Sequence, residues 1–345
     1  MIDIKGLIRK NIRELIPYSS ARDEYSGVGA VLLDANESPY NEPFNRYPDP
    51  VQMALKEKIS GIVFTPVERI FLGNGSDEAI DLLIRIFCEP SADRIIIIDP
   101  SYGMYKVCAD INNVGVDFVS LNKDFSLDAE RLLAAVREET KMVFLCSPNN
   151  PSGNLLGKAE ITRILSEFKG MVVLDEAYID FCGSEGMLPE HGEHWNLVIL
   201  RTLSKAWGLA GIRLGMALAD PEVIQYMNRV KYPYNVNYLT QIKALEMLGS
   251  AGSRKKWVKE ILAERIKLEG RLEEIGYVLK IFPSDANFLL VRVEDPDGIY
   301  AFLNEGGVIV RNRSRLTHCE GCIRITVGTP DENNKLIELM KSYPQ

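Results

Sequence analysis

Runs of apolar residues with the length of strands alternate with amphipathic segments over the first two thirds of the chain. The apolar runs predict strands at 70–72, 94–98, 117–119, 142–146, 171–174 and 197–200. The amphipathic segments predict helices at 51–60, 77–89, 103–112, 128–138 and 158–168. Strands that are apolar on both faces and separated by helices are typical of a mostly parallel sheet covered on both sides. We therefore expect an α/β fold.

The two ends of the chain show different patterns. Before Pro17, apolar residues at near-helical spacing predict an amphipathic arm. After the boundary signal at 233–237, the pattern predicts a small α+β unit. Its elements are a long helical stretch at 240–275, strands at 277–282, 288–291, 308–310 and 322–327, and helices at 298–305 and 331–343. We expect an N-terminal arm at 1–35, a large domain at 36–233 and a small domain at 234–345.

Composition narrows the possible partners. The net charge of −8, from 40 basic and 48 acidic residues, argues against a nucleic-acid surface. The chain has no uninterrupted apolar segment near its start and none of membrane-spanning length, so we expect a cytoplasmic protein that binds no membrane. Cys319-x-x-Cys322 has a spacing found in metal and redox sites, but no second pair accompanies it. We expect no metal site.

Polar residues follow several of the predicted strands, and ligands of such sheets bind beyond the carboxyl ends of the strands. Gly73–Asp77 opens a helix with two glycines and a hydroxyl, which suits an anion such as phosphate but also an ordinary helix cap. Tyr102 follows the strand at 94–98, where it fits packing or a ligand ring. Asn150 lies in a proline-rich turn, and Asp175 ends an apolar strand. A carboxylate there is costly unless it meets a cation or hydrogen-bond donors.

Lys205 follows the apolar strand at 197–200 and precedes a segment rich in Gly and Ala. If Ser204 caps a short helix, Lys205 lies in its first turn, where the helix dipole disfavours a cation. Desolvation and the nearby Arg201 and Arg213 would lower the pKa of the amine further. A deprotonated lysine can attack a carbonyl carbon. A solvated lysine beside a helix cap fits the same residues.

Five motifs in order make the chain similar to the fold-type I aminotransferases, which depend on pyridoxal 5′-phosphate (PLP). The motifs are Gly73–Glu78, Ser147–Gly153, Asp175–Tyr178, Ser204–Lys205 with Arg213, and Arg324–Thr329. The resemblance implies PLP as cofactor and the fold of that family, a large domain with a mostly parallel sheet and a smaller α+β domain. Ser152 and Trp207 depart from the Thr and Phe that the family often has there.

The resemblance also implies a role for each matching residue. Lys205 would hold PLP through an imine and carry the substrate proton, and Asp175 would keep the ring nitrogen protonated. Tyr178 and Asn150 would hold the ring oxygen. The other implied cofactor contacts are Tyr102 at the ring, Gly75, Ser76, Asp77, Ser204 and Arg213 at the phosphate, and Tyr47 from a second subunit. The implied assembly is a homodimer, with the N-terminal arm packed on the small domain.

The substrates follow from the same resemblance. Its closest branch transfers an amino group between L-histidinol phosphate, a phosphorylated amino alcohol, and 2-oxoglutarate, giving imidazole-acetol phosphate and glutamate. Arg324 would fix the substrate carboxylate, because a guanidinium fork suits carboxylate and phosphate alike. Arg311 and Tyr18 are further candidates for the phosphate. Arg313 and Arg315 nearby make Arg311 equally consistent with a plain basic loop.

Other functions fit parts of the sequence. A threonine-phosphate decarboxylase or an aromatic amino-acid aminotransferase would share the fold and most of the motifs. A regulator without turnover would need an added DNA-binding domain, for which the short N-terminal segment leaves no room. A nucleotide-binding α/β protein would need the glycine fingerprint, and Glu78 occupies its third glycine position.

Overall fold

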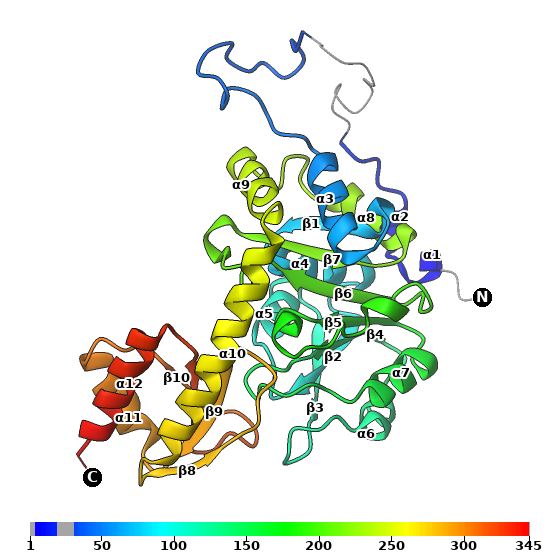
Figure 1. Ribbon diagram of the computed structural model, residues 1–345. Coiled ribbons are helices and arrows are strands. Elements are labelled where there is room, and N and C mark those ends of the chain that lie inside the picture. Colours follow the sequence, from blue (N-terminus) through cyan, green and yellow to red (C-terminus); the bar gives the residue numbers. More distant parts are fainter. Residues whose placement is uncertain (1–3, 19–30, 345) are drawn as a thin grey trace.

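The computed structural model describes residues 4–18 and 31–344, which form two sheets joined by a long helix, α10 (Figure 1). The helices are α1 (Ile4–Leu7), α2 (Lys10–Arg13), α3 (Met53–Val63), α4 (Ser76–Phe87), α5 (Met104–Ile111), α6 (Ala129–Ala134), α7 (Lys158–Glu167), α8 (Pro221–Val230), α9 (Tyr238–Leu248), α10 (Ala251–Glu273), α11 (Pro296–Glu305) and α12 (Pro330–Ser342). The strands are β1 (Ile70–Asn74), β2 (Arg94–Asp99), β3 (Gly115–Ser120), β4 (Thr140–Cys146), β5 (Met171–Asp175), β6 (Leu197–Thr202), β7 (Leu214–Leu218), β8 (Val278–Ile281), β9 (Phe288–Val293), β10 (Arg311–Asn312) and β11 (Cys322–Thr326).

The larger sheet has seven strands in the order β1-β7-β6-β5-β4-β2-β3. Strand β2 runs parallel to both of its neighbours, β3 and β4. The pairs β4–β5 and β5–β6 are also parallel. Strand β7 runs antiparallel to its neighbours β1 and β6. The carboxyl ends of β4, β5 and β6 therefore lie at one edge of the sheet. This confirms the predicted α/β fold, although β7 was not predicted.

Helices cover both faces of this sheet, as Figure 1 shows, and alternate strand residues enter two separate cores. In β4, Phe144 belongs to the core shared with α4, α5 and α8. Its neighbours Val143 and Leu145 belong to the core shared with α3, α6 and α7. All three side chains are fully buried. Burial on both sides explains why these strands are almost continuously apolar in sequence.

The smaller sheet is antiparallel, in the order β10-β11-β9-β8, and packs against α10, α11 and α12. The long helical stretch predicted at 240–275 consists of two helices, because the chain turns at Gly249 and Ser250 between α9 and α10. The predicted strand at 308–310 does not form, and the short strand β10 follows it instead. Within the described part of the chain, no helix is both long enough and apolar enough to cross a bilayer.

The N-terminal segment differs from the expected arm. Ile4, Ile8 and Ile12 are buried in the core of the large domain, and Arg9 Nε lies 3.0 Å from Glu89 Oε2 after α4. Residues 4–13 thus form two short helices on the large domain, rather than an arm on the small domain, because their apolar face meets α4 and α8. Residues 1–3 and 19–30 of the predicted arm lie outside the described residues. Residues 31–52 lack helices and strands and project from the top of the molecule in Figure 1.

Candidate active site

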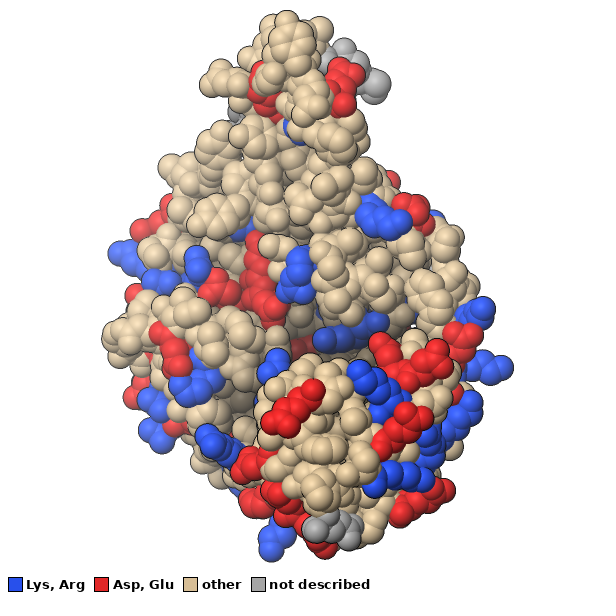
Figure 2. Space-filling model, turned by 90° about the vertical axis from the view of Figure 1, so that its left-hand side faces the viewer, with Lys and Arg blue, Asp and Glu red and all other residues tan. Residues whose placement is uncertain are grey.

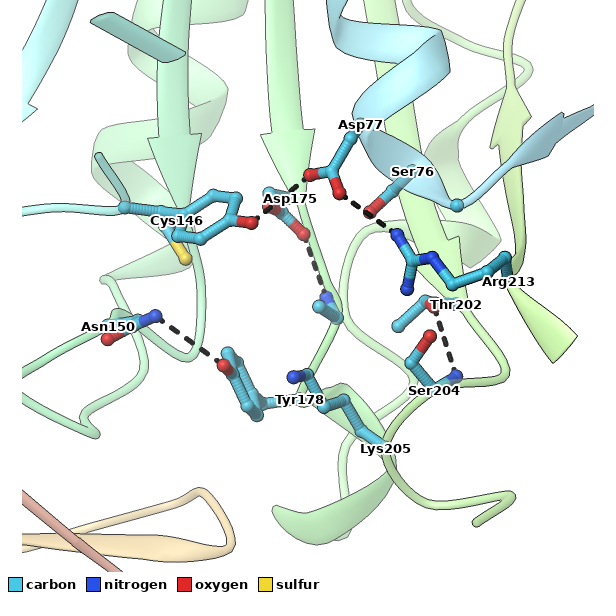
Figure 3. Close-up of a pocket in the computed structure, with 13 residues that line it drawn as sticks. Ser76, Asp77, Cys146, Asn150, Asp175, Tyr178, Thr202, Ser204, Lys205 and Arg213 are labelled. Atoms are coloured by element: carbon cyan, nitrogen blue, oxygen red, sulfur yellow. Dashed lines mark hydrogen bonds and ion pairs between the residues drawn. The ribbon is translucent and has the colours of Figure 1, made fainter. Parts of the chain in front are cut away.

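A pocket lies at the carboxyl ends of β4, β5 and β6, bounded by the start of α4 and the segment after β6 (Figure 3). The predicted site residues that line it are Gly75, Ser76, Asp77, Tyr102, Asn150, Asp175, Tyr178, Ser204, Lys205 and Arg213. Cys146, Ala177 and Thr202 complete the lining. Residues that are up to about 140 positions apart in sequence meet here because parallel strands present their carboxyl ends at one edge.

The start of α4 approaches β7 very closely. A Cβ atom at Gly215 would lie 2.1 Å from the backbone nitrogen of Ser76, so only glycine fits at this position of β7. Gly75 has φ +80° and donates its N–H to the carbonyl of Arg213 at 2.8 Å. The helix start therefore turns its first N–H groups toward the pocket, where an anion would be stabilised.

Arg213 and Asp77 form an ion pair at this end of the pocket, with 3.2 Å between Nη2 and Oδ2. The other carboxylate oxygen of Asp77 accepts a hydrogen bond from the Tyr102 hydroxyl at 3.1 Å. Figure 3 shows the Arg213 guanidinium beside Ser76 and Asp77. The carboxylate of Asp77 thus holds Arg213 and Tyr102 in place, while its charge would repel an anion.

Asp175 is the last residue of β5 and is only 4% exposed. It accepts hydrogen bonds from the Tyr105 hydroxyl at 2.7 Å and from the Ala177 N–H at 3.0 Å. Burial raises the pKa of Asp175, and the bond from Tyr105 opposes that shift. The donors expected for a carboxylate at a strand end are thus present, but part of the cost of burying its charge remains.

Tyr105 is a site residue that the sequence did not indicate. It is fully buried in α5, its ring stacks on Phe144 at 4.9 Å, and its ring meets that of Tyr102 edge-on at 5.5 Å. Its hydroxyl contacts the pocket through Asp175. The sequence indicated that Asp175 needs a hydrogen-bond donor, but it did not indicate which side chain supplies that donor.

Lys205 lies in a turn after β6 and not in the first turn of a helix, so the expected cap by Ser204 and the helix-dipole effect are absent. Its Nζ lies 5.5 Å from the centre of the Tyr178 ring. The side chain remains accessible at the pocket mouth, yet desolvation and the charge of Arg324 lower the pKa of the amine. Arg213 contributes in the same direction. Arg201, expected to act likewise, is instead paired with Glu176 at 2.7 Å.

Arg324 links the small domain to the pocket. From β11 it donates a hydrogen bond to Asn150 Oδ1, and Asn150 Nδ2 lies 3.5 Å from the Tyr178 hydroxyl. Burial lowers the pKa of Arg324 and raises that of Tyr178. Phe288 on β9 packs edge-on against the Tyr178 ring at 5.2 Å. The wall of the pocket near Tyr178 is therefore fixed by both domains.

Four predicted residues do not line the pocket in the described chain: Arg324, which reaches it through Asn150, and Tyr18, Arg311 and Tyr47. Tyr18 is 73% exposed, and Arg311 is exposed on β10. Tyr47 is half exposed, and its ring stacks on Tyr234 with 4.4 Å between ring centres.

The Cys319 and Cys322 thiols are buried, and burial raises the pKa of Cys319 to about 12. Within residues 4–18 and 31–344, no three His, Cys, Asp or Glu side chains are grouped so that they could hold a metal ion.

Comparisons with known proteins place this geometry in a family. Residues 25–339 match the family described as "Aminotransferase class I and II". The chain is 55% identical over 342 residues to the histidinol-phosphate aminotransferase of Parabacteroides distasonis, covering 99% of both proteins.

Solved structures agree. The histidinol-phosphate aminotransferase of Clostridium acetobutylicum superposes with a TM-score of 0.79 at 26% identity, covering 86% of this chain and 90% of that one. The histidinol-phosphate aminotransferase of Sinorhizobium meliloti, solved in complex with pyridoxal-5′-phosphate, has the same fold, with a TM-score of 0.78 at 24% identity over 87% of this chain and 84% of that one. The chain therefore belongs to the class I and II aminotransferase family.

Proposed function

We propose that the protein transfers the amino group between L-histidinol phosphate and 2-oxoglutarate, giving imidazole-acetol phosphate and glutamate, as a PLP-dependent step of histidine biosynthesis. The observation that carries the reaction type is the pocket in which the Lys205 amine, with its lowered pKa, and the buried Asp175 carboxylate share one small space. The substrate follows from the relative that is 55% identical over nearly the full length of both chains.

The residues of the pocket fit PLP in charge and position. The N–H groups at the start of α4 and the Arg213 guanidinium suit its phosphate. The Asp175 carboxylate suits a protonated ring nitrogen, and the Tyr178 hydroxyl with the Asn150 amide suits the ring oxygen. Bound PLP supplies an electron sink that weakens the Cα–H bond of the amino acid or amine attached to it.

The side chains around this group have separate tasks. The Lys205 Nζ would hold the cofactor and would move the proton at the substrate Cα as a general base. Its lowered pKa favours the neutral amine that both tasks require. Asp175 would hold positive charge at the ring nitrogen, and Tyr105 and the Ala177 N–H fix the orientation of its carboxylate.

At the substrate end, we propose that the Arg324 guanidinium binds a substrate carboxylate. Its hydrogen bond to Asn150 fixes one edge of the fork, and its buried Nε has no partner among the described residues. A buried donor without a partner is costly, so an arriving carboxylate would satisfy it. Arg311 and Tyr18 remain proposals for the phosphate of the amino donor.

We also propose a homodimer in which Tyr47 reaches the phosphate end of the partner's pocket. The projecting segment carries exposed apolar side chains, namely Val31, Leu33, Tyr40, Phe44 and Tyr47. Figure 2 shows the top of the molecule with few charged residues, whereas the lower part is densely charged. A group of exposed apolar side chains favours burial against another protein surface. The domain limits at 35/36 and 233/234 and the cytoplasmic location stay predictions.

Single half-reactions test the proposal. Mixed with L-histidinol phosphate alone, the PLP-loaded protein should lose its absorption above 400 nm, and 2-oxoglutarate should restore it. Borohydride reduction followed by peptide mapping should place the cofactor on Lys205. Failure to react with L-histidinol phosphate, together with fast reaction of aromatic amino acids or release of CO₂ from threonine phosphate, would favour one of the alternatives of the same fold.

A further inference from the structure

Three arginines lie on one face of the small sheet. Arg311 on β10 pairs directly with Arg324 on β11. The pairing continues past β10, because the N–H of Arg313 donates to the carbonyl of Cys322 at 2.8 Å. Side chains alternate between the faces of a strand, and directly paired residues share a face. Arg311, Arg313 and Arg324 therefore share a face, whereas Asn312 points to the other one and donates a hydrogen bond to Asp297 in the first turn of α11.

This face of the small sheet is the one turned toward the pocket. Arg324 reaches Asn150 in the large domain. Phe288 pairs with Thr326, two residues along β11 from Arg324, and its ring contacts that of Tyr178. The charges of Arg324 and Arg313 both oppose the rise that burial produces in the pKa of Tyr178. Arg313 thus lies on the pocket side of the sheet, on the same face as Arg324 and Phe288.

The charge of this group is not balanced within the chain. In the part of the chain that the structure describes, no ion pair joins Arg311, Arg313 or Arg324 to a carboxylate. The Nε atoms of Arg313 and Arg324 are buried without a hydrogen-bond partner there. Burial and the charge of Arg311 lower the pKa of Arg313. Half-buried cations that repel one another and have free donors form a site for an anion.

We propose that Arg313 is a specificity-determining residue, which binds the phosphate ester of the amino donor together with Arg311 and Arg324. This rests on the proposed function and adds a residue that the sequence had suggested only as part of a plain basic loop. A phosphate monoester carries a charge of about −1.5 to −2 and three acceptor oxygens at neutral pH. A carboxylate carries one charge on two oxygens and needs only the fork of Arg324. The third guanidinium therefore favours the phosphorylated donor over its alcohol.

The test compares L-histidinol phosphate with L-histidinol as amino donors of the PLP-loaded protein. Arg313→Gln should lower kcat/KM for the phosphate ester by about 30-fold, mainly through KM, because one charge-assisted hydrogen bond is lost. The value for L-histidinol should change by less than about threefold, since no phosphate contact is involved. Arg313→Lys should recover part of the loss. Arg315→Gln removes an exposed cation of the same loop and serves as the matched control.

Titration of the PLP-loaded protein with inorganic phosphate reports the same site without turnover. Arg313→Gln should weaken this binding by about tenfold, and Arg315→Gln should not. The role of Arg313 would be overturned if Arg313→Gln and Arg315→Gln weakened phosphate binding equally. It would also be overturned if Arg313→Gln lowered kcat/KM equally for L-histidinol phosphate and L-histidinol. If the wild type does not use L-histidinol phosphate but Arg313→Gln still weakens phosphate binding, the proposed function fails and the anion site stands. If the wild type uses L-histidinol phosphate and Arg313→Gln has the same kcat/KM and the same phosphate affinity, the role of Arg313 is refuted and the proposed function stands.

Discussion

The pocket and the projecting segment at 31–52 contain predicted site residues in opposite situations. Asp175 and Tyr178 are 4% and 8% exposed, and their neighbours come from strands that the sheet holds in register. Tyr47 is 50% exposed, its N–H donates to the Glu37 carboxylate, and its ring stacks on that of Tyr234. The pocket is thus completed by the topology of one chain, whereas the segment touches α9 and the loop before it and leaves several apolar side chains exposed.

The largest expected effect lies at the centre of the pocket. Lys205→Ala should lower turnover by about 10⁴-fold or more, because both covalent attachment and proton transfer lose their group. The fold should persist, since Lys205 lies in a surface-accessible turn, and circular dichroism and the unfolding midpoint would show this. Lys123→Ala, at an exposed lysine outside the pocket, is the control. Turnover retained in Lys205→Ala would remove this residue from the mechanism.

Arg324, which joins the two domains at the pocket, should show the next largest effect. Arg324→Gln should lower kcat/KM for 2-oxoglutarate by about 100-fold, through loss of a bidentate, charge-assisted contact. It should also raise the pKa of Lys205, because the positive charge of Arg324 now lowers that pKa. The rate at which PLP attaches to the cofactor-free protein increases with pH as Lys205 loses its proton. The midpoint of this increase should lie at a higher pH in the variant than in the wild type.

Arg324→Lys separates these two effects. It keeps the charge but not the planar fork, so the pH dependence of PLP attachment should stay near that of the wild type while kcat/KM remains low. A pH profile that shifts equally in both variants would contradict an electrostatic effect of Arg324 on Lys205.

The difference between the two regions also explains what the sequence could predict. Strand-end residues such as Asp175 and Asn150 could be grouped in advance, because a parallel sheet brings strand ends together whatever the loops do. Tyr105 was not predicted, because it lies within α5 and does not follow the end of a strand. The wrong expectation for Arg201 has a similar cause, since its partner Glu176 comes from a neighbouring strand. The place of Tyr47 depends on a second chain, which no pattern within one sequence specifies.

The projecting segment should give a smaller effect that depends on assembly. Tyr47→Phe should weaken PLP binding by about tenfold, because one hydrogen bond to a phosphate is lost. Fluorescence titration with PLP would measure this at protein concentrations that keep the dimer intact. Tyr40→Phe, at an exposed tyrosine of the same segment, should leave the affinity unchanged. Equal affinity of Tyr47→Phe and wild type would argue that the segment serves assembly without touching the cofactor.

The smallest effect concerns stability, and its sign distinguishes the pocket from an exposed surface site. Because burial raises the pKa of Asp175 in the folded state, its ionised carboxylate destabilises the cofactor-free protein. That cost is absent below the unfolded pKa of about 3.9 and develops as pH rises through the folded pKa. Asp175→Asn should therefore raise the free energy of unfolding of the cofactor-free protein by about 1 kcal/mol at pH 7. The gain should shrink toward pH 4.5.

Asp124 supplies a control of opposite sign at the surface, because hydrogen bonds from Ser126 lower its pKa. Asp124→Asn should lower the free energy of unfolding a little at pH 7, because the folded state favours the ionised carboxylate of Asp124. It should have no effect at low pH, where that carboxylate is protonated in both states. Thermal unfolding midpoints of both variants and the wild type, measured from pH 4.5 to 8 without PLP, would decide. If Asp175→Asn unfolds earlier than the wild type at pH 7, then Tyr105 and Ala177 already compensate the buried charge. The pocket would then be no more costly to fold than the surface, and its carboxylate could not be regarded as held ready for a cation.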